Sequence, residues 1–300
     1  MGLVKLRVMD DRFQADLWCQ ALEQRGIAHL LRTYEDTAYD GIYVTQKGYG
    51  VIYVEEEHLE AARGVDQDLA QSLACPDPAQ LARSIDHTLL DAAAGEAELE
   101  THLEQCLEME AAAACVSPWM VPRAVRALAG SPVAVCTVVG FPLGTQTSAA
   151  KLAEAGEAAE AGAVELDVVL NRGWALGGEL ERSVAEMADL ARELPGRVIK
   201  VILETSALGP EASRRAARAL VDTGVEYLKT GTGFFGPATV EEVSLLARAV
   251  EGRLDIKAAG GIRSLADALA LQAAGAQRLG TSSGYDIYRQ ARERWEQAES

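Results

Sequence analysis

The sequence contains no run of about 18 apolar residues, the length that a membrane-spanning helix requires. Its first residues reach a charged side chain within five positions and lack the apolar core of a secretory signal peptide. Cysteine is scarce, because only five occur, singly and without Cys-x-x-Cys spacing. These absences predict a cytoplasmic protein with free thiols, without membrane spans, structural disulfides or a bound metal.

Positive charge is also in short supply. The chain has 28 Lys and Arg against 45 Asp and Glu, which gives a net charge of −17. An acidic surface repels nucleic acids and anionic lipids, so neither is an expected partner. An anionic small molecule would have to be bound by a local site, because the overall field repels it.

Lysine is the scarcer of the two cationic residues, since only six of the 28 are lysines. Three of the six, Lys200, Lys229 and Lys257, lie in short apolar segments that read as strands. A buried ammonium group is unfavourable. Unlike arginine, however, lysine can lose its proton and act as a nucleophile. A single strand lysine can extend its end to solvent, but three in a lysine-poor chain favour a chemical role.

The pattern of residues 1–73 predicts a small β-α-β-β-α unit. Its length and the tyrosines concentrated in it distinguish it from the rest of the chain. The expected elements are a strand at 3–9, a helix at 10–26, a strand at 27–33, a hairpin-like pair at 41–54 and a closing helix at 55–73. Residues 74–79, with two prolines, predict a linker.

Residues 80–300 alternate apolar strand-like segments with segments of helical length. This pattern predicts a (β/α)₈ TIM barrel, so the fold class is α/β. The expected strands are "SIDHTLL", "AAACV", "VAVCTVV", "AVELDVVL", "RVIKVILE", "VEYLKTG", "LDIKAAGG" and "AQRLGTS". Several of the intervening helices end at glycine, which can take the left-handed conformation that caps a helix.

Polar residues at the carboxyl ends of these strands mark the expected active site, because TIM barrels carry their chemistry there. The last three strand ends are rich in glycine: "TGTGF", "AAGGIR" and "GTSSG". Their exposed backbone N–H groups and the helix N-termini that follow predict a phosphate site. The alternative is that these glycines only form tight turns.

Lys229 and Lys257 are expected on neighbouring strands. Burial and a second cation nearby would lower the pKa of Lys229, and its neutral amine could then form a Schiff base with a carbonyl. Asp167 and Asp86 could relay protons. In the alternative, these carboxylates form structural ion pairs with the lysines and raise the lysine pKa values. The residues alone leave both alternatives open.

Eight motifs together resemble those of the 2-deoxyribose-5-phosphate aldolases, which are class I, Schiff-base aldolases. They span residues 80–285 and read "IDHTLL", "ACVSP", "VVGFPLG", "ELDVVLN", "KVILET", "LKTGTGF", "IKAAGGIR" and "RLGTSSG". The resemblance implies reversible cleavage of 2-deoxy-D-ribose 5-phosphate to acetaldehyde and D-glyceraldehyde 3-phosphate, without a cofactor or metal. A homodimer is the assembly considered.

The resemblance also implies residue roles. Lys229 corresponds to the Schiff-base lysine, Lys257 to the lysine that tunes it, Asp167 to the proton relay and Asp86 to the support of Lys257. Lys200 corresponds to a barrel lysine that is not the nucleophile. The implied substrate-binding residues are Thr88, Cys115, Thr232, Gly233, Gly260, Gly261, Ser282 and Ser283. Cys115 is equally well explained as a small buried apolar residue.

The chain departs from the family pattern at both ends. It lacks the C-terminal tyrosine of some members, and it carries the extra unit at 1–73. That unit weakly resembles small signal-transducing modules, and it is either a packing appendage or a regulatory sensor. Two other functions are therefore kept: a Schiff-base aldolase for another phosphorylated sugar, and a non-catalytic phosphosugar sensor.

Overall fold

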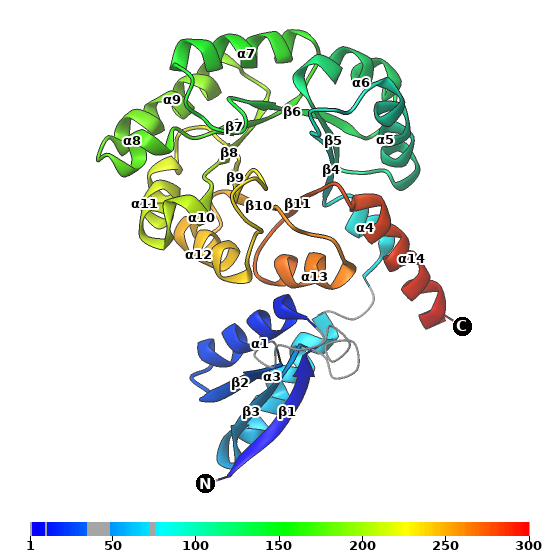
Figure 1. Ribbon diagram of the computed structural model, residues 1–300, viewed down its shortest axis with the longest axis vertical. Helices are drawn as coiled ribbons and strands as arrows, with labels where there is room; N and C mark the ends of the chain where they lie inside the picture. Colours follow the sequence, from blue (N-terminus) through cyan, green and yellow to red (C-terminus); the bar gives the residue numbers. More distant parts are fainter. Residues whose placement is uncertain (1, 10, 35–48, 73–75, 300) are drawn as a thin grey trace.

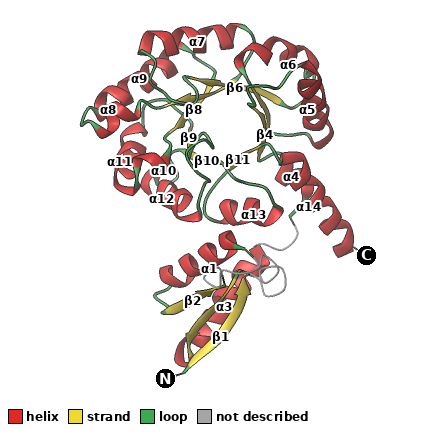
Figure 2. Ribbon diagram, viewed as in Figure 1, coloured by secondary structure: helices red, strands yellow, loops and turns green. Residues whose placement is uncertain are grey.

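The computed structural model describes residues 2–9, 11–34, 49–72 and 76–299 (Figure 1). It confirms the fold class, because a closed barrel of eight parallel strands follows a small three-stranded sheet. Strands form the wall of the barrel and helices surround it (Figure 2). No helix in the described ranges has the length and apolar character needed to cross a membrane.

The small sheet has the strand order β1-β3-β2, with antiparallel pairing throughout. Its elements are β1 (Leu3–Met9), α1 (Arg12–Gln24), β2 (His29–Thr33), β3 (Gly50–Glu55), η1 (Glu56–His58) and α3 (Leu59–Ser72). The second half of the expected hairpin is β3, whereas residues 41–48 lie outside the described part. The Trp18 indole is buried and donates to Asp66 at 2.7 Å, which joins α1 to α3.

A short helix, α4 (Pro78–Ala82), begins inside the segment expected as a linker. Its cap is Asp77, whose carboxylate accepts a hydrogen bond from the Ala79 amide at 2.9 Å. Proline suits the first helical position because the amide it lacks would have no partner there. Pro78, the second of the two prolines that suggested a linker, therefore begins a helix.

The barrel strands follow each other around the closed sheet in chain order. They are β4 (Ile85–Leu89), β5 (Ala113–Val116), β6 (Ala134–Val139), β7 (Glu165–Val169), β8 (Val198–Ile202), β9 (Tyr227–Lys229), β10 (Asp255–Ala259) and β11 (Arg278–Thr281). Each one falls within a segment that the sequence predicts as a strand. In the register, Lys229 lies opposite Lys257, which confirms that the two lysines are on neighbouring strands.

Helices cover the outer face of the barrel. They are α5 (Glu96–Met109), η2 (Pro118–Met120), α6 (Val121–Ala127), α7 (Ser148–Glu160), α8 (Arg172–Leu176), α9 (Leu180–Glu193), α10 (Thr205–Leu208), α11 (Pro210–Leu220), α12 (Val240–Val250), α13 (Leu265–Ala273) and α14 (Gly284–Glu299). Gly162, after α7, has a φ of +107°, and a Cβ there would lie 2.9 Å from Val125. Only glycine fits this return to the sheet.

The small unit packs beside the barrel, with α1 against α12 and α13 (Figure 1). The Ser244 hydroxyl of α12 donates to the Gln20 side chain of α1 at 2.7 Å. Buried side chains of both parts belong to one continuous apolar cluster. The small unit and the barrel therefore share a packed apolar interface.

Candidate active site

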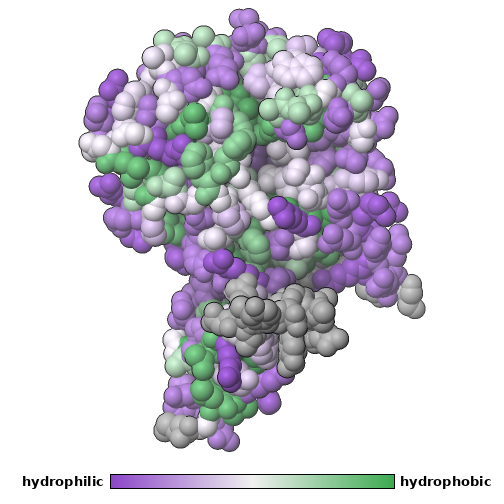
Figure 3. Space-filling model, viewed as in Figure 1, coloured by the Kyte–Doolittle hydropathy of each residue, from purple (hydrophilic) through white to green (hydrophobic). Residues whose placement is uncertain are grey.

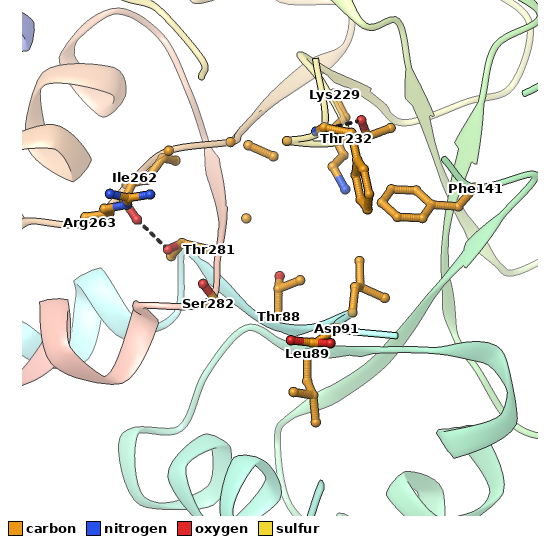
Figure 4. Close-up of a pocket in the computed structure, with 17 residues that line it drawn as sticks. Thr88, Leu89, Asp91, Phe141, Lys229, Thr232, Ile262, Arg263, Thr281 and Ser282 are labelled. Atoms are coloured by element: carbon orange, nitrogen blue, oxygen red, sulfur yellow. Dashed lines mark hydrogen bonds between the residues drawn. The ribbon is translucent and has the colours of Figure 1, made fainter. Parts of the chain in front are cut away.

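A pocket of about 450 Å³ opens at the carboxyl ends of the barrel strands (Figure 4). Its walls come mainly from the ends of β4, β9, β10 and β11 and from the loops that follow them. The amine of Lys229 points into the cavity, with Thr88 and Asp91 on the opposite wall. The pocket is therefore where the fold class predicts the chemistry.

Lys229 is the one strand lysine among Lys200, Lys229 and Lys257 that lines this pocket. Its side chain is 5% exposed, whereas those of Lys200 and Lys257 are 0% exposed. The three lysines thus differ in access: one reaches a ligand, and two lie inside the barrel wall.

The carboxylate of Asp167 binds all three ammonium groups. Its Oδ2 accepts hydrogen bonds from Lys229 Nζ and Lys257 Nζ, each at 2.7 Å. Its Oδ1 accepts one from Lys200 Nζ at 3.1 Å. Lys229 and Lys257 therefore meet at one carboxylate oxygen.

Asp86 and Glu165 complete the network. Asp86 Oδ2 lies 2.5 Å from Lys257 Nζ and 2.9 Å from Lys200 Nζ. Glu165 Oε2 lies 2.5 Å from Lys200 Nζ. Arg278 donates to Asp86 Oδ1, and to Glu165 Oε1 at 2.9 Å. We call this set the charge cluster: Asp86, Glu165, Asp167, Lys200, Lys229, Lys257 and Arg278.

Ion pairing dominates the acid–base properties of the cluster. Burial opposes ionisation of Asp86, but the charges of Lys200 and Lys257 hold its pKa well below the ordinary value. The pKa of Asp167 is lowered against burial in the same way. Burial alone would lower the pKa of Lys257, but Asp167 and Asp86 raise it above the ordinary value. Of the two alternatives for the paired lysines, the ion pair describes Lys257.

Two thiols lie beside the cluster on the inner face of the barrel. Cys136 Sγ is 3.3 Å from both Asp167 Oδ1 and Lys200 Nζ. Burial raises the pKa of the Cys136 thiol. Cys115 is its register partner on β5 and is fully buried, without lining the pocket. Cys115, which was expected close to the site, thus lies behind the residues that line the pocket.

The same inward-facing groups are the ones that come close enough to hold a cation. One possible set is Cys115, Cys136 and Asp167, and another is Asp86, Cys136 and Glu165. Both sets already face the ammonium groups of the charge cluster. In this part of the described structure, lysine nitrogens thus occupy the position that a metal would need.

Glycine backbone forms the other end of the pocket. Gly233, Gly260 and Gly261 have positive φ values of 86°, 110° and 71°. A Cβ on Gly260 would lie 2.9 Å from the Gly236 carbonyl oxygen, and one on Gly261 would lie 2.7 Å from Pro237 Cβ. The close packing of these two loops therefore requires glycine.

Serine and arginine complete the glycine end. Ser282 lines the pocket, and Arg263 lies in the same wall beside Ile262 (Figure 4). The Ser283 amide donates to the Thr281 hydroxyl at 3.0 Å, and Ser283 does not line the pocket. Of the two expected serines, the structure therefore brings only Ser282 to the cavity.

Glu204 holds the loop that follows Lys229. Its Oε2 accepts from the Thr232 hydroxyl at 2.5 Å and from the Thr232 amide at 3.1 Å. Arg172 Nη1 lies 3.6 Å from the same oxygen, and the Arg172 guanidinium stacks over Phe235 at 4.3 Å. Glu204 itself adopts a left-handed backbone, with a φ of 60°. Thr232 is thus fixed at the pocket wall by a buried carboxylate.

Two aromatic side chains lie at the mouth of the pocket. Phe141 and Phe234 pack edge to face at 5.7 Å, and Phe234 is 66% exposed. Three of the four phenylalanines in the chain therefore lie at or beside this rim: Phe141, Phe234 and Phe235. The barrel face in Figure 3 shows hydrophobic side chains near its middle and hydrophilic ones around its margin.

Sequence reasoning assigned no role to several residues of this site. Arg278, Glu165 and Glu204 carry its ion pairs and hydrogen bonds, and Arg263 lies in its wall. Arg278 had a usable signal, because it interrupts the apolar strand "AQRLGTS" as the lysines interrupt theirs. Glu204 stands at a strand end, but only the fold shows that it faces Thr232.

A closed TIM barrel with one accessible lysine in its pocket is the arrangement of a TIM-barrel enzyme that uses a lysine side chain in catalysis. Residues 81–290 match the model of the DeoC/LacD family aldolases, and the chain belongs to this family. The matched segment begins at residue 81, so the small sheet unit lies outside it.

Relatives and solved structures agree with the family assignment. A deoxyribose-phosphate aldolase from Microcystis aeruginosa is 47% identical over 72% of this chain and 96% of its own length. One from Deinococcus radiodurans is 46% identical over 69% and 94%. Among solved structures, that of the aldolase QR15 has a TM-score of 0.69 at 37% identity over 72% and 97%. The tetrameric deoxyribose phosphate aldolase from Aeropyrum pernix has a TM-score of 0.69 at 31% identity, over 74% and 95%.

Proposed function

We propose that this chain is a class I deoxyribose-phosphate aldolase. It would reversibly cleave 2-deoxy-D-ribose 5-phosphate to acetaldehyde and D-glyceraldehyde 3-phosphate. The observation that carries the proposal is the single lysine amine, Lys229, that enters the pocket from a buried charge cluster. Family membership and the named relatives support the substrate.

The proposed chemistry proceeds through a Schiff base on Lys229. The neutral amine attacks the aldehyde carbon C1 of the open-chain sugar, and water leaves. The C3 hydroxyl then loses its proton and the C2–C3 bond breaks, so that its electron pair moves into the iminium to form an enamine. Glyceraldehyde 3-phosphate departs, C2 takes up a proton, and hydrolysis releases acetaldehyde.

The charge cluster would supply the acid–base groups for these steps. Asp167 contacts the nitrogens of Lys229 and Lys257 through one oxygen, which suits a group that moves protons between them. Asp86 holds Lys257 at 2.5 Å. Lys257 thereby stays a fixed cation beside the nucleophile.

The glycine end of the pocket would bind the phosphate. Backbone N–H groups can approach an anion where no side chain intervenes, and the guanidinium of Arg263 adds a positive charge. The proposed phosphate-binding residues that line the pocket are Gly233, Gly260, Gly261 and Ser282. Thr88 and Thr232 lie between the two ends, where hydroxyls of the sugar chain would pass. Ser283 and Cys115 remain predicted contacts that would act from behind the wall.

Reductive trapping tests the proposal. Borohydride in the presence of acetaldehyde should leave an ethyl group on Lys229, which peptide mass mapping identifies. Lys229→Ala should give no adduct, and Lys257→Leu should lower the trapping rate about 10²-fold or more, because the nucleophile loses its neighbouring cation. Full cleavage activity in Lys229→Ala would refute the assignment.

We also propose a cytoplasmic location and a homodimer. The Aeropyrum pernix relative is described as a tetramer. Measurement of the molecular mass in solution tests whether this chain forms a homodimer. The small sheet unit is proposed as a packing appendage, since α1 lies against α12 and α13 through buried side chains.

A further inference from the structure

A second cavity, of about 220 Å³, lies where the small sheet unit packs against the barrel (Figure 1). We call it the interface cavity. Its walls come from β1, α1 and α3 of the small unit and from α13 and α14 of the barrel. It shares no lining residue with the active-site pocket, so it is a separate site.

The charged side chains that line the interface cavity are arginines. Arg7 lines it from β1 and Arg294 from α14, and no carboxylate is among the described lining residues. Arg7 forms an ion pair with Asp66 at 3.0 Å, whereas Arg294 has no ion-pair partner in the described part of the chain. Two guanidinium groups and one carboxylate leave a local excess of one positive charge in a chain of net charge −17. The cavity therefore favours an anion that the overall field repels.

Much of the remaining lining is apolar. Trp18 and Leu269 are buried, and Ala70 and Ala266 add small side chains from α3 and α13. The Arg7 guanidinium lies over the Trp18 ring, with Cζ 4.8 Å from the ring centroid. Cavities that combine apolar walls with a few polar groups are typical sites for small molecules. The interface cavity has this composition.

Hydrogen bonds hold both walls of the cavity in place. On the small unit, one oxygen of Asp66 accepts from the Arg7 guanidinium at 3.0 Å and from the Trp18 indole at 2.7 Å. On the barrel, the Gln290 side chain of α14 accepts from the Leu265 amide, at the start of α13, at 2.9 Å. The cavity is therefore formed without a ligand, which lowers the free-energy cost of binding one.

We propose that the interface cavity binds a small organic anion. Its phosphate or carboxylate group pairs with Arg7 and Arg294, and its carbon part contacts Trp18 and Leu269. Guanidinium groups suit this role because they can bind an oxyanion through two parallel hydrogen bonds. The active-site pocket, at about 450 Å³, is about twice as large, so the ligand of the interface cavity is smaller than a five-carbon sugar phosphate. Because the ligand contacts both parts of the chain, it also stabilises their packing.

The Trp18 indole N–H provides a local signal for this site. Its resonance in a proton–nitrogen NMR spectrum of the full-length chain is identified by its loss in Trp18→Phe. Glycerol 3-phosphate and lactate, each added at constant ionic strength, are the phosphate and carboxylate probes. At least one of them should shift this resonance in a saturable way, and uncharged glycerol should not. The inference is overturned when neither probe shifts it.

Three variants test whether the probe lies in the interface cavity. Arg294→Gln should weaken binding about 10-fold or more, because a charge-assisted contact is lost. Arg289→Gln is the matched control, since it removes an exposed arginine from the same helix that does not line the cavity. Its affinity should equal that of the parent. Ala70→Leu fills part of the cavity without a change of charge and should also weaken binding.

A phosphate probe can also enter the active-site pocket, so the two sites need separate variants. Arg263 lines the active-site pocket and not the interface cavity, and Arg263→Gln should leave the Trp18 shift unchanged. Loss of the shift in Arg263→Gln, or parental affinity in Arg294→Gln, would overturn the inference. Trapping on Lys229 tests the aldolase function separately, because Lys229 does not line the interface cavity. Failure of one proposal is therefore distinguishable from failure of the other.

Discussion

Glu204 provides a quantitative test of the active-site architecture. It is buried, and its carboxylate accepts hydrogen bonds from the Thr232 hydroxyl at 2.5 Å and amide at 3.1 Å. A hydrogen bond to a charged group contributes about 1.5–3 kcal/mol. Arg172 would lose its carboxylate neighbour as well. We therefore expect Glu204→Ala to lower the free energy of unfolding by about 3–5 kcal/mol.

The backbone of Glu204 allows a sharper comparison. With a φ of 60° it occupies the left-handed region, where alanine is strained and glycine is not. Glu204→Gly loses the same side-chain contacts as Glu204→Ala. It should nevertheless be more stable by about 1 kcal/mol, because the strain is relieved. In most other positions of a fold, glycine would be the worse of the two.

Urea unfolding measures these differences, and steady-state cleavage of deoxyribose 5-phosphate measures their effect on function. The KM of Glu204→Ala should rise more than its kcat falls, because Thr232 loses its fixed position at the pocket wall. Glu211→Ala is the matched control, since Glu211 forms an exposed pair with Arg214 at 2.6 Å. Such pairs contribute about 0–1 kcal/mol. A loss below about 1 kcal/mol in Glu204→Ala would contradict the analysis.

Two further predictions concern buried groups outside the pocket. Burial lowers the pKa of His102, stacked on His87 at 4.4 Å, to about 3. A depressed histidine pKa stabilises the fold above pH 6.5, and this stability is lost as the pH falls. Between pH 7 and pH 5 His102 should account for about 2 kcal/mol, which His102→Leu should abolish; equal pH slopes in parent and variant would rule this out. Lys151→Met should cost about 3–5 kcal/mol, because it strands the buried Glu186 carboxylate 2.8 Å away. Lys151→Met combined with Glu186→Leu should recover most of that in denaturant unfolding, and no recovery would contradict the pairing.

The barrel was predictable because its signals are local. Each strand is a short apolar run, and each helix repeats its apolar residues with helical spacing. Each pattern therefore lies within one short stretch of sequence. The position of two lysines on the neighbouring strands β9 and β10 was also predictable, because consecutive strands of a TIM barrel lie side by side. The proline signal at residues 74–79 was local as well, because a proline can mark a linker or begin a helix.

The site itself was predictable only in part. Lys229, Lys257, Asp167 and Asp86 stand out as ionisable residues in apolar strands, and all four meet in one cluster. Arg278 interrupts an apolar strand in the same way, but the sequence does not show which residue it pairs with. Its importance comes from a contact with Asp86, which precedes it by 192 residues.

The amino-acid pattern alone specifies the eight-strand barrel, the ionisable residues placed in its interior and the glycine-rich loops at the end of its pocket. The pairing of the buried charges, in contrast, depends on how the strands pack together in three dimensions. Whether a buried lysine has its pKa raised or lowered depends on carboxylates within about 4–6 Å. For Lys257 those carboxylates come from β4 and β7. The strength of such an ion pair changes strongly over a few ångströms. Its two partners come from distant parts of the chain, so only the packing of the strands sets the distance between them.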